Sequence, residues 1–187
     1  EQMRALGVSD STCHAWTRNS RIFAAAPRVY SLGHRALSPR GALRAELLSA
    51  GDDSALSHSS SLCFADIVDL DDPRIHLTVP RGSCGPRRAG VVVHRATHLD
   101  PRDIVVVQGL ATTTVARSLI DLAGSVPEST LGFACRQAEY KRRLDVVEIG
   151  QTLARMNRPR GVRALRRVLA ATGIDEVILE TRLEERL

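Results

Sequence analysis

Two short β-rich runs on either side of a glycine- and proline-rich loop constrain the fold of this chain more than any other feature. RIHLTVP, residues 74–80, alternates apolar and polar side chains as half-buried strands do. GVVVHRA, residues 90–96, is rich in β-branched residues, and the intervening RGSCGPRRAG predicts the loop of a hairpin. DIVVVQGLATT, residues 103–113, adds one or two strands. We therefore expect a small, mostly antiparallel sheet in the middle of the chain.

Helix signals surround this sheet. Ser38 is a suitable N-cap, Pro39 suits the first helical position and Gly51 can end the helix in a left-handed conformation. A helix over residues 39–50 is expected to bury one face, formed by Leu43, Leu47 and Leu48.

The second half of the chain is predicted to be helical from Thr114 onward. Ser125 and Glu128 have the spacing of a capping box, and further helices are expected at 146–156 and 161–171. Strands followed by a run of helices define an α+β protein rather than an alternating α/β one.

The charge of the chain is unevenly distributed. The formal net charge is +5, and residues 1–40 hold six arginines against two acidic residues, whereas residues 51–72 hold six aspartates and no lysine or arginine. A basic N-terminal part is the side expected to face phosphates. The chain contains neither a long apolar span nor a secretory leader, so we expect a cytoplasmic protein without membrane contact.

The N-terminal segment has the pattern of a helix-turn-helix. A helix ending near Leu6, a turn at Gly7 and a new helix capped by Ser9 would present the first turns of the second helix to the major groove of DNA. RIFAAAPRVYSLG, residues 21–33, then contains two β-prone runs around a small-residue turn, as a wing does. Val8, Cys13 and Trp16 are expected to form the small core behind the second helix.

Double-stranded operator DNA is therefore the expected partner of this segment. The candidate DNA-binding residues are Ser9, Ser11, Thr12, His14, Arg18, Arg21 and Arg28. The plainer alternative is a helix pair and a hairpin that pack on the rest of the chain and carry solvated arginines.

A second phosphate-binding patch is expected at the loop between the two β-rich runs. Its candidates are Arg81, Arg87, Arg88 and Arg95. A solvated loop is the alternative for the same residues.

Other polar residues are expected to have structural roles. His58, His76, His94 and His98 are assigned to capping or hydrogen bonding, and the aspartates of residues 66–72 to an acidic surface loop. The four cysteines, which we expect to be reduced and mostly buried, form no CxxC pair. No catalytic residue, metal site or cofactor is predicted.

Several blocks resemble the AbiEi-type antitoxin family. They are RVYSLGHRALSPRGALRAELLSAGDDSALSHSSS, IHLTVPR, VVVHRA and GLATTTVARSLIDLAG, in that order. The resemblance implies a winged helix-turn-helix followed by a mixed α/β antitoxin-like domain. It also implies a transcriptional regulator of a type IV toxin-antitoxin system, which counteracts a nucleotidyltransferase-like toxin without a stable complex. The family pattern has a basic residue where this chain has Ser59.

The resemblance divides the chain into three parts. Residues 1–36 correspond to the winged helix-turn-helix without its first helix, residues 37–172 to the antitoxin-like domain, and residues 173–187 to the start of a truncated DUF559-like domain. Glu180 or Glu184 would be an outlying acidic residue of such a nuclease, but no carboxylates or lysine follow to complete a metal site. We therefore expect this chain itself not to be an enzyme. The alternatives are the non-catalytic front of a nuclease and a protein-interaction module.

Overall fold

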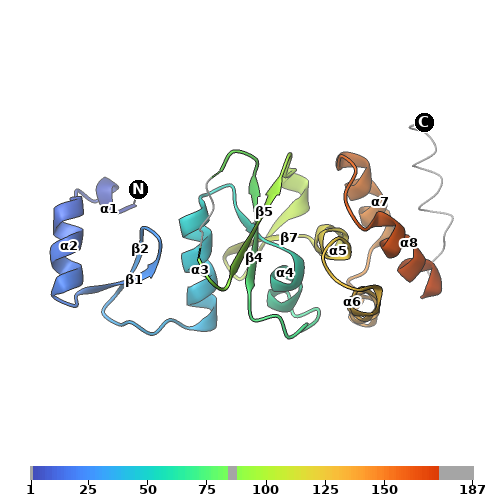
Figure 1. Ribbon diagram of the computed structural model, residues 1–187, viewed down its shortest axis with the longest axis horizontal. Coiled ribbons are helices and arrows are strands. Elements are labelled where there is room, and N and C mark those ends of the chain that lie inside the picture. Colours follow the sequence, from blue (N-terminus) through green and yellow to red (C-terminus); the bar gives the residue numbers. More distant parts are fainter. Residues whose placement is uncertain (1, 84–87, 173–187) are drawn as a thin grey trace.

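The computed structural model describes residues 2–83 and 88–172, and it has an α+β fold (Figure 1). A small N-terminal unit of helices and a hairpin lies at one end, a five-stranded sheet lies in the middle, and a group of helices lies at the other end. Within these residues no helix has the length and apolar character needed to cross a bilayer.

The N-terminal unit follows the punctuation of its sequence. Helix α1 (Gln2–Ala5) ends before Gly7, whose φ of 75° makes the turn, and helix α2 (Asp10–Arg18) begins after the N-cap Ser9. Strands β1 (Ile22–Ala26) and β2 (Val29–Leu32) then pair as an antiparallel hairpin. Of the predicted small core, Cys13 is buried and Val8 and Trp16 are half-buried, and α2 contacts β1.

Helix α3 (Pro39–Ala50) joins the N-terminal unit to the sheet. Ser38 accepts a hydrogen bond from the Gly41 N–H at 3.1 Å, so the predicted start is confirmed. The hairpin lies along one side of α3 and the sheet along the other. Leu47 is buried between α3 and the sheet, but Leu48 is exposed, so that part of the prediction was wrong. Gly51 ends α3 with φ 104° and ψ 167°, which is not the left-handed helical conformation expected from the sequence.

The central sheet is mixed, with the strand order β5-β4-β3-β7-β6. Its strands are β3 (Ala55–Leu56), β4 (Ile75–Pro80), β5 (Val91–Ala96), β6 (Ile104–Val107) and β7 (Leu110–Thr113), and a 3₁₀ turn (Pro101–Asp103) precedes β6. Strands β6 and β7 form a hairpin whose turn residues, Gln108 and Gly109, both have positive φ, as a tight two-residue hairpin turn requires.

Strands β4 and β5 pair in parallel, so the hairpin expected at residues 81–90 was wrong. The ten-residue loop is long enough to return to the other end of β4. Glycine and proline are typical of a hairpin turn and of such a return loop alike, so the sequence does not distinguish them. Strand β4 is also buried on both faces rather than one, because α3 covers Leu77 and Val79 while helices on the opposite face cover His76 and Thr78.

Helices on that opposite face form the larger core. They are α4 (His58–Phe64), α5 (Val115–Ala123), α6 (Glu128–Tyr140), α7 (Val146–Arg155) and α8 (Val162–Ala171). Leu119, Leu131, Ile149 and Leu169 are fully buried among them. The expected capping box is not formed, because α6 is capped at Pro127 and the Ser125 hydroxyl donates to the Leu122 carbonyl instead.

Gly161 and Gly150 allow a direct test of this packing. Gly161 precedes α8 with φ 77°, and an added Cβ would lie 2.1 Å from the Ala123 carbonyl oxygen. We expect Gly161→Ala to lower the free energy of unfolding by about 2–5 kcal/mol through strain and overpacking. Gly150, inside α7, has open space at the Cβ position, so Gly150→Ala should raise it by about 0.5–1 kcal/mol. Denaturant unfolding measures the free energy of unfolding of both variants. Changes of the same sign would contradict the described packing at Gly161 and Gly150.

Candidate functional site

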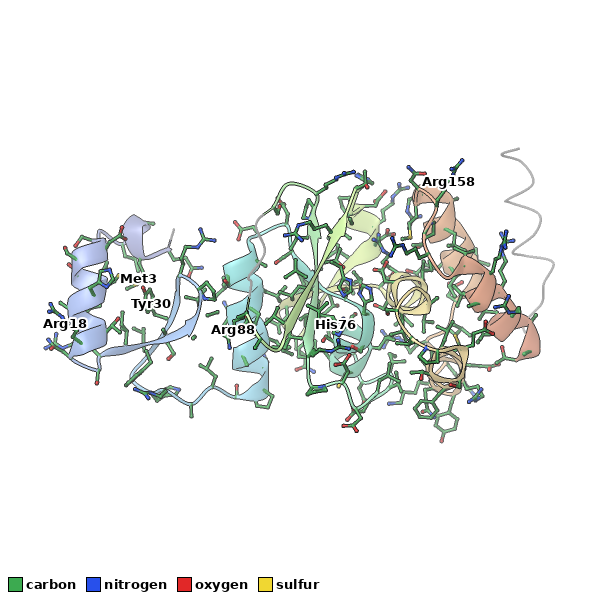
Figure 2. The ribbon with its side chains drawn as sticks, in the orientation of Figure 1. Met3, Arg18, Tyr30, His76, Arg88 and Arg158 are labelled. Carbon is green, nitrogen blue, oxygen red and sulfur yellow. The ribbon has the colours of Figure 1, made fainter. Side chains whose placement is uncertain are left out.

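The exposed face of α2 carries three of the predicted DNA-binding residues. Ser11, His14 and Arg18 are spaced three and four residues apart, so they share one face of the helix, and all three are exposed. In Figure 2, Arg18 points away from the hairpin on the outer side of α2, whereas Met3 and Tyr30 face each other across the inside of the unit. The structure thus presents a polar, basic helix face to solvent.

Ser9 and Thr12 serve the helix rather than its outer face. The Ser9 side chain accepts the Thr12 N–H at 3.1 Å and lies 2.8 Å from the hydroxyls of both Ser11 and Thr12. Thr12 is half-buried. The hydroxyls of Ser11 and Thr12 therefore both contact the cap of α2, and His14 is the freest of the three residues, Ser11, Thr12 and His14, that are predicted to reach base edges.

Arg21 and Arg28 lie at opposite ends of the hairpin. Arg21 follows α2, where its N–H donates to the Trp16 carbonyl, while Arg28 sits in the β1–β2 turn with φ 63°. The carbonyl of Pro27 in that turn accepts a hydrogen bond from Ser49 of α3 at 3.0 Å. The tip of the expected wing is therefore attached to α3, whereas Arg21 is exposed just after α2.

Three members of the second predicted phosphate patch lie in the described residues, with Arg81 and Arg95 near one end of the β4–β5 pair and Arg88 near the other. Arg88 donates to the Ala25 carbonyl at 3.0 Å and lies 3.3 Å from the carboxylate of Glu46, so it links the hairpin, the loop and α3. Glu46 is buried, which raises its pKa although Arg88 opposes the shift. Arg81 and Arg95 are exposed, and Arg87 lies outside the described residues.

A cavity of about 550 Å³ opens between the sheet and the helices that cover it. His58, Thr78 and His94 line its inner wall, together with Arg117 and Asp121 of α5. Exposed basic side chains stand at its rim, namely Arg95, His98 and Arg160.

A buried ion network holds one wall of this cavity. Arg117, 3% exposed, donates to both carboxylate oxygens of Asp121 at 3.1 and 3.0 Å and to Asp103 at 3.0 Å. Asp103, 1% exposed, also accepts from Arg155 of α7. Burial raises the pKa of Asp121 to about 6, although the Arg117 guanidinium opposes the shift. The network ties the 3₁₀ turn to α5 and α7.

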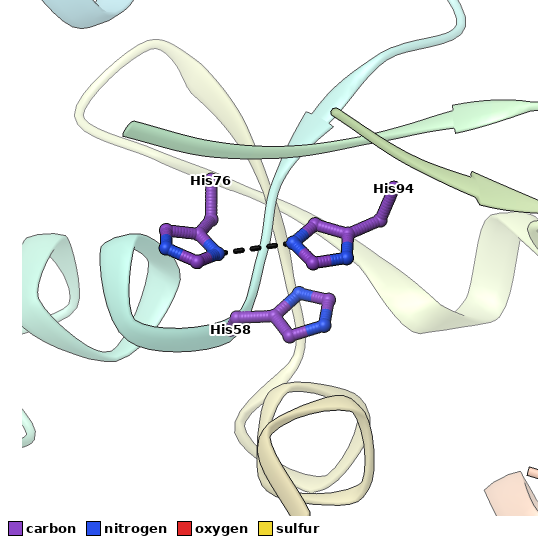
Figure 3. A group of neighbouring side chains, drawn as sticks. All are labelled: His58, His76 and His94. Atoms are coloured by element: carbon purple, nitrogen blue, oxygen red, sulfur yellow. Dashed lines mark hydrogen bonds between the residues drawn. The ribbon is translucent and has the colours of Figure 1, made fainter. Parts of the chain in front are cut away.

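Three histidines from three elements meet beside the cavity, and two of them, His58 and His94, line it (Figure 3). The His76 Nδ1 lies 3.0 Å from the His94 Nε2, and the rings of His58 and His94 are stacked with centroids 3.6 Å apart. Two further hydrogen bonds hold these rings. His76 Nε2 lies 2.9 Å from the Asp72 carboxylate, and His58 Nδ1 lies 2.9 Å from the Ser57 hydroxyl.

The local backbone explains why these rings converge. The Ser57 N–H donates to the His76 carbonyl, and the Ser60 hydroxyl accepts the His76 N–H, which fixes the start of α4 against β4. His58 has a φ of 53°, a conformation uncommon for a residue with a side chain. The parallel pairing of β4 and β5 places His94 beside Thr78, on the same face of the sheet as His76.

All three imidazoles favour the neutral form. Burial lowers the pKa of His94 to about 4 and that of His58 further, with the neighbouring histidines acting in the same direction. Burial also lowers the pKa of His76, against the opposing effect of Asp72. The cluster therefore offers uncharged ring nitrogens at neutral pH.

Sequence reasoning missed this cluster because it assigned each histidine separately. His58, His76 and His94 follow no ligand spacing, and only the pairing of β4 with β5 brings the last two together. Asp72, assigned to a solvated acidic loop, instead accepts from His76 and from Arg74. Of the cysteines, Cys13 and Cys135 are buried but Cys63 is exposed, and Cys84 lies outside the described residues.

Comparisons with known proteins give a likeness in fold. No family model and no curated protein matches the chain. Among solved structures, the crystal structure of the RV2827C protein from Mycobacterium tuberculosis matches with a TM-score of 0.65 and 16% sequence identity. The match covers 99% of this chain and 73% of that one. At this identity the likeness shows that the two chains share a fold.

The ion network predicts a large difference between two carboxylate substitutions. Asp103→Ala leaves Arg117 buried with fewer partners, so we expect a loss of about 3–5 kcal/mol in the free energy of unfolding. The control is Glu128→Ala, which removes an exposed ion pair with Arg167 and should have little effect because water and salt screen such pairs. Denaturant unfolding of the two variants checks this, and similar losses would show that the network is not a main support of the fold.

Proposed function

We propose that this chain is a DNA-binding protein whose N-terminal unit contacts duplex DNA through α2. The observation that carries the proposal is the exposed face of Ser11, His14 and Arg18; Arg21, three residues beyond Arg18, is exposed as well. Neither Arg18 nor Arg21 forms an ion pair with any residue in the described ranges, so both are available for phosphates. Arginine suits this role because its planar guanidinium pairs with phosphate oxygens.

The roles of the residues follow from their positions on the helix. His14 and Ser11 lie in the first turns of α2, where short polar side chains reach base edges in the major groove. Arg18 lies at the end of α2, and Arg21 follows it, so both are placed to contact the DNA backbone. Arg28 stands at the far end of the hairpin and would contact a different phosphate.

The particular function that we propose is a transcriptional regulator that acts as the antitoxin of a type IV toxin-antitoxin system. The support for this step is the resemblance of the ordered sequence blocks to the AbiEi-type family. A nucleotidyltransferase-like toxin would then be its functional counterpart. The alternative, the front of a DUF559-like nuclease, depends on Glu180 or Glu184, which lie outside the described residues.

Salt dependence provides the first test. Replacing Arg21 and Arg28 together with alanine should weaken binding to a random-sequence duplex. It should also reduce the slope of log K against log salt by about 1 for each phosphate that the variant no longer binds. The matched control is Arg158→Ala, which removes an exposed arginine at the other end of the molecule (Figure 2). Fluorescence anisotropy over a salt series measures both, and an unchanged slope for the double variant would contradict the proposed role of the two arginines.

A second test separates sequence reading from backbone contact. His14→Ala should cost about 1–3 kcal/mol on a preferred duplex selected from a random pool, and little on scrambled DNA. Arg18→Ala should weaken both about equally, because phosphates carry no sequence information. Competition binding decides between the two roles. Equal losses on both duplexes from His14→Ala would mean that α2 does not read bases.

A further inference from the structure

We propose that His58, His76 and His94 form a binding site for one divalent transition-metal ion of the zinc class, with an open coordination position facing the cavity. One ring nitrogen from each of the three side chains lies within 4.8 Å of the other two. The site is in the sheet and helix part of the chain, and α2 contributes nothing to it. A test of metal binding is therefore independent of whether the chain binds DNA.

The distances are close to those of a metal site. Nitrogen ligands about 2.0–2.1 Å from a tetrahedral ion lie roughly 3.3 Å apart. The His76 Nδ1 and His94 Nε2 atoms, now 3.0 Å apart, would separate by a few tenths of an ångström. The His58 ring, which is now stacked on His94, has to rotate so that its nitrogen points at the ion, and this is a larger movement. A metal ion would thus occupy the place of the proton that His76 and His94 now share.

The hydrogen bond on the outer nitrogen of His76 selects the tautomer that a metal requires. The Asp72 carboxylate accepts a hydrogen bond from the His76 Nε2–H, which leaves the His76 Nδ1 lone pair directed at the cluster. The His58 Nδ1 faces the other two rings in Figure 3 and is hydrogen-bonded to the Ser57 hydroxyl, a bond that it would exchange for the ion. When the ion binds, the His94 proton moves from Nε2 to Nδ1, so the three neutral rings need lose no proton. A carboxylate behind a histidine is the usual support of a metal-bound imidazole.

Asp72 is itself held firmly in place. Its two carboxylate oxygens accept from the Arg74 side chain at 2.9 and 3.0 Å, and one also accepts the Arg74 N–H at 3.1 Å. Arg74 therefore fixes the position of the Asp72 carboxylate that accepts the hydrogen bond from His76.

The ligand set and its surroundings favour one class of metal. Three uncharged imidazoles suit zinc, nickel, cobalt or copper, whereas magnesium and calcium prefer oxygen ligands. His58 and His94 line the cavity, so a fourth position on the ion would face it. The Thr78 hydroxyl lines the same wall, is 2% exposed and has no hydrogen-bond partner among the described residues. A water molecule on the ion would give that hydroxyl a partner.

The experiment is a metal titration of the whole chain after treatment with a chelator. We expect one zinc ion per chain by calorimetry. We also expect cobalt to give the intense visible absorption of a four-coordinate site, and zinc to raise the melting temperature of the wild-type chain. His76→Gln and His94→Gln should each weaken zinc binding by at least 100-fold, and Asp72→Asn by about 10–100-fold.

Two controls separate this site from adventitious binding. His98→Gln removes an exposed histidine at the rim of the same cavity, and Cys63→Ser removes an exposed thiol. Both variants should bind zinc as the wild type does. If the His76 and His94 variants do not fold, zinc binding by Asp72→Asn tests the proposal. Asp72 lies outside the helical core, and its contact with His76 is the hydrogen bond to the imidazole Nε2. Absence of stoichiometric zinc binding, or binding unchanged by Asp72→Asn, would overturn the proposal and leave a packing cluster of stacked neutral rings.

Discussion

The buried carboxylate of Asp103 is the interaction on which the second half of the molecule depends. It receives Arg117 from α5 and Arg155 from α7, and the backbone carbonyl of the same residue accepts the Thr114 N–H at the start of α5. A carboxylate with so little access to water is tolerated only with cations beside it, so the 3₁₀ turn, α5 and α7 have to be in place together. The position of the cavity wall that Arg117 and Asp121 line follows from that arrangement.

Local signals in the sequence predicted most of the elements. Ser9 and Ser38 cap helices where their sequence context indicated, and the helices near 146–156 and 161–171 are present as Val146–Arg155 and Val162–Ala171. Each of these signals acts over a few residues, which is why a single sequence contains it. The capping box at Ser125 is not formed because α6 begins after Pro127 and the Ser125 hydroxyl donates to the Leu122 carbonyl in α5 instead.

Strand pairing and the histidine cluster could not be predicted in the same way. Whether β4 and β5 pair in parallel depends on the path of the loop between them, and both paths suit the same residues. His58, His76 and His94 meet only after that pairing is set, so their relation is a property of the fold. For α2, the sequence correctly placed Ser11, His14 and Arg18 in one exposed helix, but the attachment of the hairpin turn to α3 depends on Ser49, far along the chain.

The parallel pairing of β4 and β5 also sets a minimum length for the loop at residues 81–90. The chain leaves β4 at Pro80 and enters β5 at the opposite end of the sheet, next to Ile75. Six strand residues rise about 20 Å, and an extended chain covers at most about 3.3–3.6 Å per residue, so roughly six residues are needed merely to bridge the gap. A hairpin at this position could be shortened to two residues. This connection tolerates insertions far better than deletions, and its length is a geometric requirement of the site that His76 and His94 share.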